Sequence, residues 1–88
     1  MILETLRRKI DRIDNRILSL IAQRFQLVKN IKTVKQKLKK PIIDSQREKE
    51  ILKRIEQKSE ELNLSVNLTR KLYKLIFDGS KNLQKKDL

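Results

Sequence analysis

Hydrophobic residues recur at steps of three and four along the first part of the chain, with one polar interruption. The positions are Leu3, Leu6, Ile10, Ile13, Ile17, Leu20, Arg24, Leu27, Ile31, Val34 and Leu38. This spacing lines one face of a helix, so it predicts a single long helix over about residues 3–38. No Gly or Pro lies inside this range, and Lys39-Lys40-Pro41 should end the helix, because the residue before a proline is pushed out of the helical region.

Two shorter amphipathic helices should follow the proline. The second should open at Asp44-Ser45, two good N-cap residues, and Ser45 with Glu48 three positions later matches a capping box. Its apolar face consists of Ile51, Leu52, Ile55 and Leu62. The third helix should open near Ser65 or Asn67. Its apolar residues are Leu68, Leu72, Leu75, Ile76 and Leu83.

The third helix should contain a break, and the whole chain should form one domain. Gly79 should interrupt this helix, and the residues after Gln84 should be frayed. A chain of 88 residues with one Gly, one Pro and a charged, Leu/Ile-rich composition favours a single all-α domain over residues 1–88. We therefore expect three helices per chain, with a long first helix.

The length of the first helix predicts the assembly. About 36 residues form a rod of roughly 54 Å, whereas a compact chain of this size has a radius of gyration of about 12 Å and a diameter near 30 Å. The rod would overhang its own core, yet its apolar stripe continues to both ends. A second copy is the simplest cover, which predicts an intertwined helical homodimer. A plain coiled-coil dimer is the alternative, but Arg24 in the seam and two further amphipathic helices argue against it.

Arg24 occupies a position in the stripe where a leucine would be expected. A guanidinium that faces a core is costly unless an anion meets it there. Arg7 and Lys35 lie beside the same stripe, so the helix turns several positive charges toward its packing face. This arrangement predicts a buried anion, and a structural ion pair between Arg24 and Glu48 is the alternative.

The composition excludes several kinds of chemistry. The chain has no Cys and no His, which excludes disulfides, thiol chemistry, histidine bases and the usual zinc sites, and we expect no cofactor or metal. Lys and Arg number 23 against 11 acids, a net charge of +12, which favours nucleic acid, an acidic membrane or a small polyanion as partner. No apolar run approaches a membrane span and no signal peptide is visible, so we expect a cytoplasmic protein.

Polar residues gather at the edges of the two shorter helices. Asp44 and Glu48 lie four apart with Arg47 beside them, and Ser80 and Gln84 lie four apart on the third helix. Taken singly, Glu48 could merely cap its helix, while Ser80 and Gln84 could be ordinary surface residues. With the cations of the first helix, however, they describe a pocket with several positive charges, one or two acids, a hydroxyl and an amide.

Such a pocket suits a reaction that needs little proton transfer or covalent chemistry. Ser80 has no visible base to activate it. The site would work by holding a polyanion in shape and by stabilising a shift of charge within it.

The chain resembles the all-helical (AroQ-class) chorismate mutases over essentially its whole length. The resemblance lies in Leu-Arg-x-x-Ile-Asp-x-Ile-Asp at 6–14, Arg24, Lys35, Pro-Ile-x-Asp-x-x-Arg-Glu at 41–48, and Ser80-x-x-x-Gln84. Each motif is loose, but together, in register and without a gap, they are specific. The resemblance implies a cofactor-free Claisen rearrangement of chorismate to prephenate, a step of aromatic amino-acid biosynthesis.

The resemblance also implies a role for each candidate residue. In the family, an intertwined homodimer holds two active sites, and each is completed by an arginine from the partner's first helix, here Arg7. Arg7 and Arg24 would grip the two carboxylates of the substrate. The other implied roles are donation to the ether oxygen by Lys35 and Gln84, acceptance from the ring hydroxyl by Glu48 with Asp44 near by, support of a carboxylate by Ser80, and support of Glu48 by Arg47.

One position departs from the family, and other functions stay open. Some members have an arginine where this chain has Ile43, a peripheral position that should affect affinity more than activity. Isochorismate-pyruvate lyases share the fold but tend to be apolar at the position of Glu48. A small basic nucleic-acid-binding dimer agrees with the charge, but the most telling cations lie on the packing stripe and few aromatics could stack on bases. A non-catalytic helical interaction module is the last alternative, and we expect neither nucleic acid nor membrane as a partner.

Overall fold

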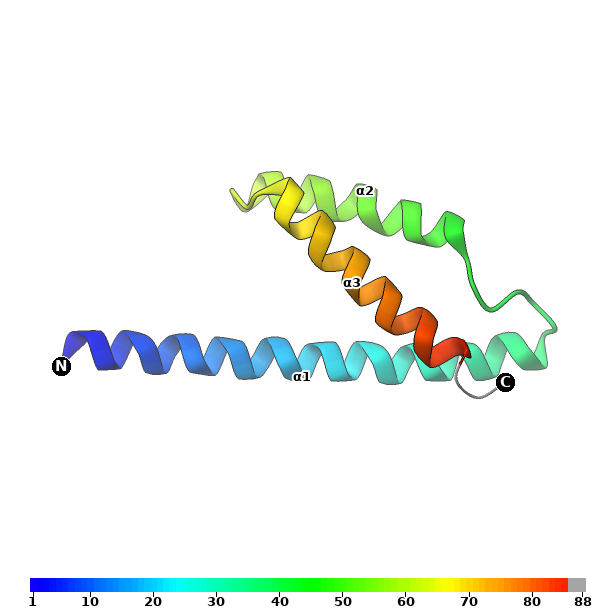
Figure 1. Cartoon of the computed structure of the whole chain (residues 1–88), viewed down its shortest axis with the longest axis horizontal. Coiled ribbons are helices and arrows are strands. Elements are labelled where there is room, and N and C mark those ends of the chain that lie inside the picture. Colours follow the sequence, from blue (N-terminus) through cyan, green and yellow to red (C-terminus); the bar gives the residue numbers. More distant parts are fainter. Residues whose placement is uncertain (86–88) are drawn as a thin grey trace.

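The computed structural model describes residues 1–85 and consists of three helices in this range. They are α1 (Ile2–Lys37), α2 (Ser45–Glu61) and α3 (Val66–Lys85). Helix α1 is a straight rod, and α3 runs diagonally from the end of α2 back to the second half of α1 (Figure 1). The expected all-α fold with a long first helix is confirmed, and none of the described helices is long and apolar enough to cross a membrane.

Helix α2 begins differently from the expected capping box. Asp44 is the N-cap, and its carboxylate accepts a hydrogen bond from the backbone N–H of Arg47 at 3.0 Å. The expected pairing of Ser45 with Glu48 is therefore wrong, because Ser45 is already the first residue of the helix. An aspartate is a strong cap because its negative charge also complements the helix dipole. The Glu48 side chain is thus available for other contacts.

A residue in the left-handed conformation follows the C-cap of both α1 and α2. Lys39 has φ 55° and Asn63 has φ 57°. The backbone N–H of Lys40 donates to the Lys35 carbonyl, and that of Leu64 donates to the Ser59 carbonyl, the pattern of a Schellman motif. Helix α1 thus ends just before the segment Lys39-Lys40-Pro41, as expected.

Helix α3 continues through Gly79, so the expected break there is wrong. Its start agrees with the sequence, since the Ser65 hydroxyl accepts a hydrogen bond from the Leu68 N–H at 3.2 Å. A Cβ at Gly79 would lie only 2.9 Å from Cζ of Phe25 on α1. The glycine therefore lets α3 approach the Phe25 ring closely. Fraying was expected after Gln84; residue 85 is still helical, and residues 86–88 lie outside the described range.

The core is small and lies mainly between α2 and α3. Ile51, Ile55 and Phe77 are buried there, with Leu52 and Tyr73 packed against them. Helices α1 and α2 each pack on α3, and the described parts of α1 and α2 do not pack on one another. The packing of α1 on α3 and of α2 on α3 therefore sets the distance between α1 and α2.

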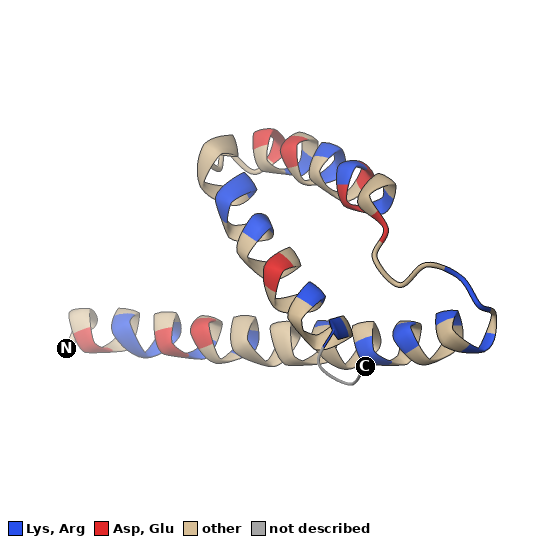
Figure 2. Ribbon diagram, turned by 45° about the vertical axis from the view of Figure 1, so that its right-hand side comes forward, with Lys and Arg blue, Asp and Glu red and all other residues tan. Residues whose placement is uncertain are grey.

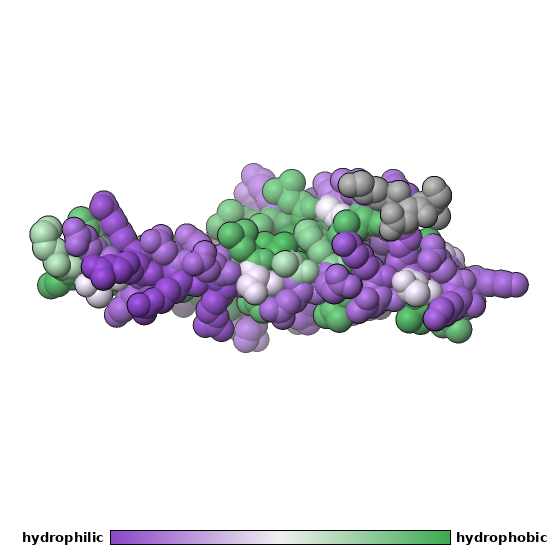
Figure 3. Space-filling model, turned by 90° about the horizontal axis from the view of Figure 1, so that it is seen from below, coloured by the Kyte–Doolittle hydropathy of each residue, from purple (hydrophilic) through white to green (hydrophobic). Residues whose placement is uncertain are grey.

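Helix α1 leaves its apolar stripe largely uncovered. The face of α1 that meets α3 carries the partly buried Phe25 and Val28 and the buried Lys32. Each of these residues directly follows a residue of the stripe, namely Arg24, Leu27 and Ile31. Ten large hydrophobic side chains of the stripe are about half exposed or more, from Leu3 to Leu38. Figure 3 shows hydrophobic atoms at the surface, at the N-terminal end of the rod and beside its middle.

The single chain exposes more surface than a compact protein of its mass. Its accessible area is 7525 Å², against about 5,500 Å² expected for a monomer of this size. Its radius of gyration is 16.3 Å, against about 12 Å for a compact chain. The excess of roughly 2,000 Å² is larger than the 800 Å² or so that each partner buries in a standard interface.

Candidate active site

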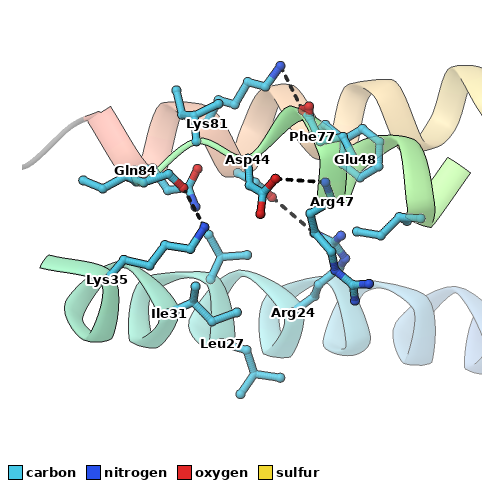
Figure 4. Close-up of a pocket in the computed structure, with 15 residues that line it drawn as sticks. Arg24, Leu27, Ile31, Lys35, Asp44, Arg47, Glu48, Phe77, Lys81 and Gln84 are labelled. Atoms are coloured by element: carbon cyan, nitrogen blue, oxygen red, sulfur yellow. Dashed lines mark hydrogen bonds and ion pairs between the residues drawn. The ribbon is translucent and has the colours of Figure 1, made fainter. Parts of the chain in front are cut away.

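One pocket collects seven of the eight predicted site residues. It has a volume of about 260 Å³ and lies between the second half of α1, the start of α2 and the end of α3. The predicted residues in its lining are Arg24, Lys35, Asp44, Arg47, Glu48, Ser80 and Gln84 (Figure 4). Ile43, which was expected to be peripheral, also lies in the lining.

Arg24 is held by neutral groups of α3. Its Nη1 donates to the Ser80 hydroxyl at 3.2 Å, and its guanidinium carbon lies 5.8 Å from the centre of the Phe77 ring. Such a cation–π contact orients a guanidinium without neutralising it. Within residues 1–85, Glu48 pairs with Lys81, so the structural ion pair considered for Arg24 is not formed. The positive charge of Arg24 remains available to an anionic ligand.

Lys35 is tethered to the segment between α1 and α2. Its Nζ donates to the backbone carbonyl of Ile42 at 3.2 Å. An ammonium group has three N–H donors, so this bond fixes the position of Lys35 and leaves donors for a ligand. In Figure 4, Lys35 and Gln84 lie toward one end of the pocket, and Arg24 and Arg47 lie toward the other.

The acids on α2 differ from the expectation in their partners. Arg47 pairs with Glu50 at 3.6 Å, while Glu48 pairs with Lys81 of α3 at 2.9 Å. The support that Arg47 was expected to give Glu48 is therefore not seen in this structure. Adjacent residues on a helix point in different directions, whereas residues three or four apart lie side by side.

Helix α3 supplies a line of side chains along one side of the pocket. Phe77 and Ser80 are buried and Gln84 is partly buried, at steps of three and four that keep them on one helix face. The sequence indicated Ser80 and Gln84, but Phe77 was missed. Its spacing from Ser80 was the signal that could have identified it.

Arg7 is the predicted site residue that does not reach this pocket. It is exposed on the N-terminal half of α1, 17 positions before Arg24 on the same helix, which corresponds to about 26 Å along the axis. An arginine side chain cannot span that distance. Arg7 can join such a site only if it belongs to another chain.

The pocket is positively charged and has largely apolar walls. Four cations, Arg24, Lys35, Arg47 and Lys81, face the two carboxylates of Asp44 and Glu48, so the formal charge of the lining is +2. Figure 2 shows the origin of this excess, since α1 carries basic but no acidic residues from position 15 to 37. In residues 1–85 no three His, Cys, Asp or Glu side chains gather where they could hold a metal ion.

Comparison with known proteins identifies the family. Residues 6–85 match the family described as chorismate mutase type II. The chain is 42% identical to the chorismate mutase of Methanocaldococcus jannaschii over 86 residues, which cover 98% of this chain and 87% of that protein. The chain belongs to the chorismate mutase type II family. It is also 39% identical over 80 residues to the bifunctional chorismate mutase/prephenate dehydratase of Buchnera aphidicola, covering 91% of this chain and 21% of that protein.

Lys81 is a residue of this chorismate mutase type II domain that the sequence did not indicate. It directly follows Ser80, so on helical geometry alone it points about 100° away from the Ser80 side chain. The diagonal course of α3 brings it to Glu48 (Figure 4). The hydrogen bond to Glu48, and then its charge, raise the pKa of Lys81 above the ordinary value of 10.5.

Proposed function

We propose that the protein is a chorismate mutase that converts chorismate to prephenate in aromatic amino-acid biosynthesis. The main support is that residues from all three helices gather in one pocket with a formal charge of +2 and no histidine or cysteine. Chorismate carries two carboxylates, so its charge complements the lining. The family membership and the M. jannaschii relative point to the same activity.

The chemistry of the rearrangement fits what this pocket contains. In a Claisen rearrangement the ether C–O bond breaks as a new C–C bond forms within the same molecule, and no group leaves. No proton acceptor or nucleophile is required. The site has to hold the substrate in a compact reactive conformation and stabilise the negative charge that grows on the ether oxygen.

The positions of the side chains suggest how the work is divided. Lys35 and Gln84, toward one end of the pocket, would donate to the ether oxygen, and Arg24 would hold a carboxylate. Because Ser80 and Phe77 already orient Arg24, little rotational freedom is lost on binding. Glu48 would accept a hydrogen bond from the ring hydroxyl, while Asp44 is engaged as a helix cap.

The active form is a homodimer in which Arg7 of each chain completes the other chain's pocket. Two observations support this proposal: the distance of Arg7 from its own pocket, and the uncovered stripe on α1. A partner helix along the stripe would bury apolar surface and bring a second arginine for the other carboxylate. The cytoplasmic location stays a prediction.

The activity is tested by following chorismate absorbance with purified protein and identifying the product. We expect prephenate, and we expect Arg24→Ala to remove most of the activity because the carboxylate loses a charged partner. Release of pyruvate from isochorismate instead would identify a lyase. A wild-type protein that converts neither chorismate nor isochorismate, although its circular dichroism shows intact helices, would refute both enzymatic functions.

Shared active sites are tested by mixing two inactive homodimers, Arg7→Ala and Arg24→Ala. In a mixed dimer one site carries both defects and the other carries none. After full exchange of equal amounts, half of the dimers are mixed, so about a quarter of all sites should work. If mass spectrometry demonstrates exchange and no activity returns, the two arginines do not act in one site from different chains.

A further inference from the structure

Two consecutive residues of α3 hold opposite walls of the pocket. Ser80 accepts a hydrogen bond from Arg24 of α1, and Lys81 pairs with Glu48 of α2 at 2.9 Å. Since α1 and α2 do not pack on one another in the described chain, α3 is the helix through which both walls are placed. The C-terminal part of α3 therefore contacts a pocket residue of α1 and a pocket residue of α2 at the same time.

Lys81 and Glu48 form an ion pair whose two members both line the pocket. The side chains of this pair are 36% and 22% exposed, against 44% and 34% for Arg70 and Glu56, another pair that joins α3 to α2. Exposed pairs along a single helix contribute little. This pair joins two helices at the rim of the pocket, where a second acid, Asp78, also acts on Lys81.

The pocket contains other cations with which the Glu48 carboxylate could pair. Arg24, Lys35 and Arg47 line the same cavity, and a carboxylate on a flexible side chain is drawn to any of them. If Glu48 turned toward Arg24, it would neutralise the group that should bind a substrate carboxylate. It would also withdraw the acceptor intended for the ring hydroxyl.

We propose that Lys81 is a positioning residue that holds Glu48 away from the substrate-binding cations and aims its free oxygen at the ring hydroxyl. This inference rests on the proposed chorismate mutase activity. Lys81 bonds to Oε1 of Glu48, which leaves Oε2 for the ligand. Lys81 itself touches no reacting atom and acts through Glu48.

The test compares Lys81→Met with Lys81→Arg and with the control Lys71→Met. Lys71 lies exposed on the same helix and does not line the pocket, so its variant removes the same charge from α3 without touching Glu48. We expect Lys81→Met to raise KM by roughly three- to tenfold with a smaller change in kcat, as suits a partly exposed pair. Lys81→Arg keeps the charge and the donor and should stay within about twofold of wild type, as should Lys71→Met.

A second comparison asks whether Lys81 acts through Glu48. In a Glu48→Gln background the side chain is neutral and is no longer drawn to the arginines, so Lys81→Met should have no further effect. If turnover of Glu48→Gln is too slow to measure, calorimetric binding of prephenate provides the same comparison. An equal loss in both backgrounds, or an unchanged KM in Lys81→Met, would overturn the positioning role.

The two proposals fail in different ways. Wild-type protein that does not convert chorismate would overturn the proposed function and, with it, the role of Lys81. An active wild type whose Lys81→Met variant keeps the same KM would overturn only the role of Lys81. A melting temperature measured for each variant separates loss of position from loss of folding.

Discussion

Gly79 offers a test of how closely α1 and α3 approach beside the active site. In an ordinary helix interior, Gly→Ala stabilises by about 1 kcal/mol. Here the added Cβ would meet Cζ of Phe25 at 2.9 Å, with the two flanking ring carbons at 3.5 and 3.7 Å. These nearly equal distances show that the ring points end-on at the glycine, so the clash falls on its tip.

The size of the effect follows from this contact. Ordinary carbon–carbon contacts begin near 3.4 Å, so the ring or the helices must shift by about 0.5 Å. Forcing extra volume into a packed joint costs about 1–3 kcal/mol. We therefore expect Gly79→Ala to bring no gain in the free energy of unfolding and to lose as much as about 2 kcal/mol.

The contribution of the ring is isolated with Phe25→Leu, whose shorter side chain leaves room at Gly79. In that background Gly79→Ala should stabilise by about 1 kcal/mol, because only the helix propensity remains. Urea unfolding of the four proteins at one fixed chain concentration gives the coupling, which should be at least about 1 kcal/mol. A gain of about 1 kcal/mol in both backgrounds would show that Phe25 does not limit the approach of the helices.

Four further outcomes are expected. Lys35→Ala should lower kcat by about 10²–10³ with unchanged circular dichroism, and near-normal kcat would demote Lys35 to a surface charge. The wild-type rate should be nearly flat between about pH 6 and 8, whereas Gln84→Glu should be active mainly in acid, where the new carboxyl can donate; equal profiles would remove Gln84 from the ether oxygen. Lys39→Gly should stabilise by about 0.5–1 kcal/mol and more than Asn63→Gly, because asparagine tolerates the left-handed region better than lysine; urea midpoints decide between the two. The carboxylate of Glu48 raises the pKa of Lys81. The stabilisation from this ion pair is therefore present below the ordinary lysine pKa and is lost as the pH rises through the folded-state pKa. The melting temperatures of wild type and Lys81→Met should converge above about pH 10.5.

Local rules predicted the helices well because each depends on residues a few positions apart. The stripe with steps of three and four predicted α1 to within one residue at each end, and Ser65 marked the start of α3. The same rules failed where two local choices competed. Asp44 displaced Ser45 as the cap of α2, since an aspartate satisfies the backbone N–H of Arg47 and complements the dipole at once.

Contacts between helices were harder to predict because they depend on how the helices cross. Glycine lowers helix propensity, so a break at Gly79 was expected. The helix continues, and the ring of Phe25 packs against the space that a side chain at position 79 would fill. Glu48 was expected to be supported by its sequence neighbour Arg47. Lys81, 33 positions later, reaches it instead because α3 crosses the pocket at an angle.

The sequence by itself determined three helices, the excess of cations on the second half of α1 and the residue types of the site. These features follow from composition and from spacing along one helix. Only the tertiary structure decided that Ser80 orients Arg24, that Lys81 holds Glu48 and that Arg7 lies beyond the reach of its own pocket. The reason is physical: helical periodicity fixes which side chains share a face, while packing between helices fixes which faces meet.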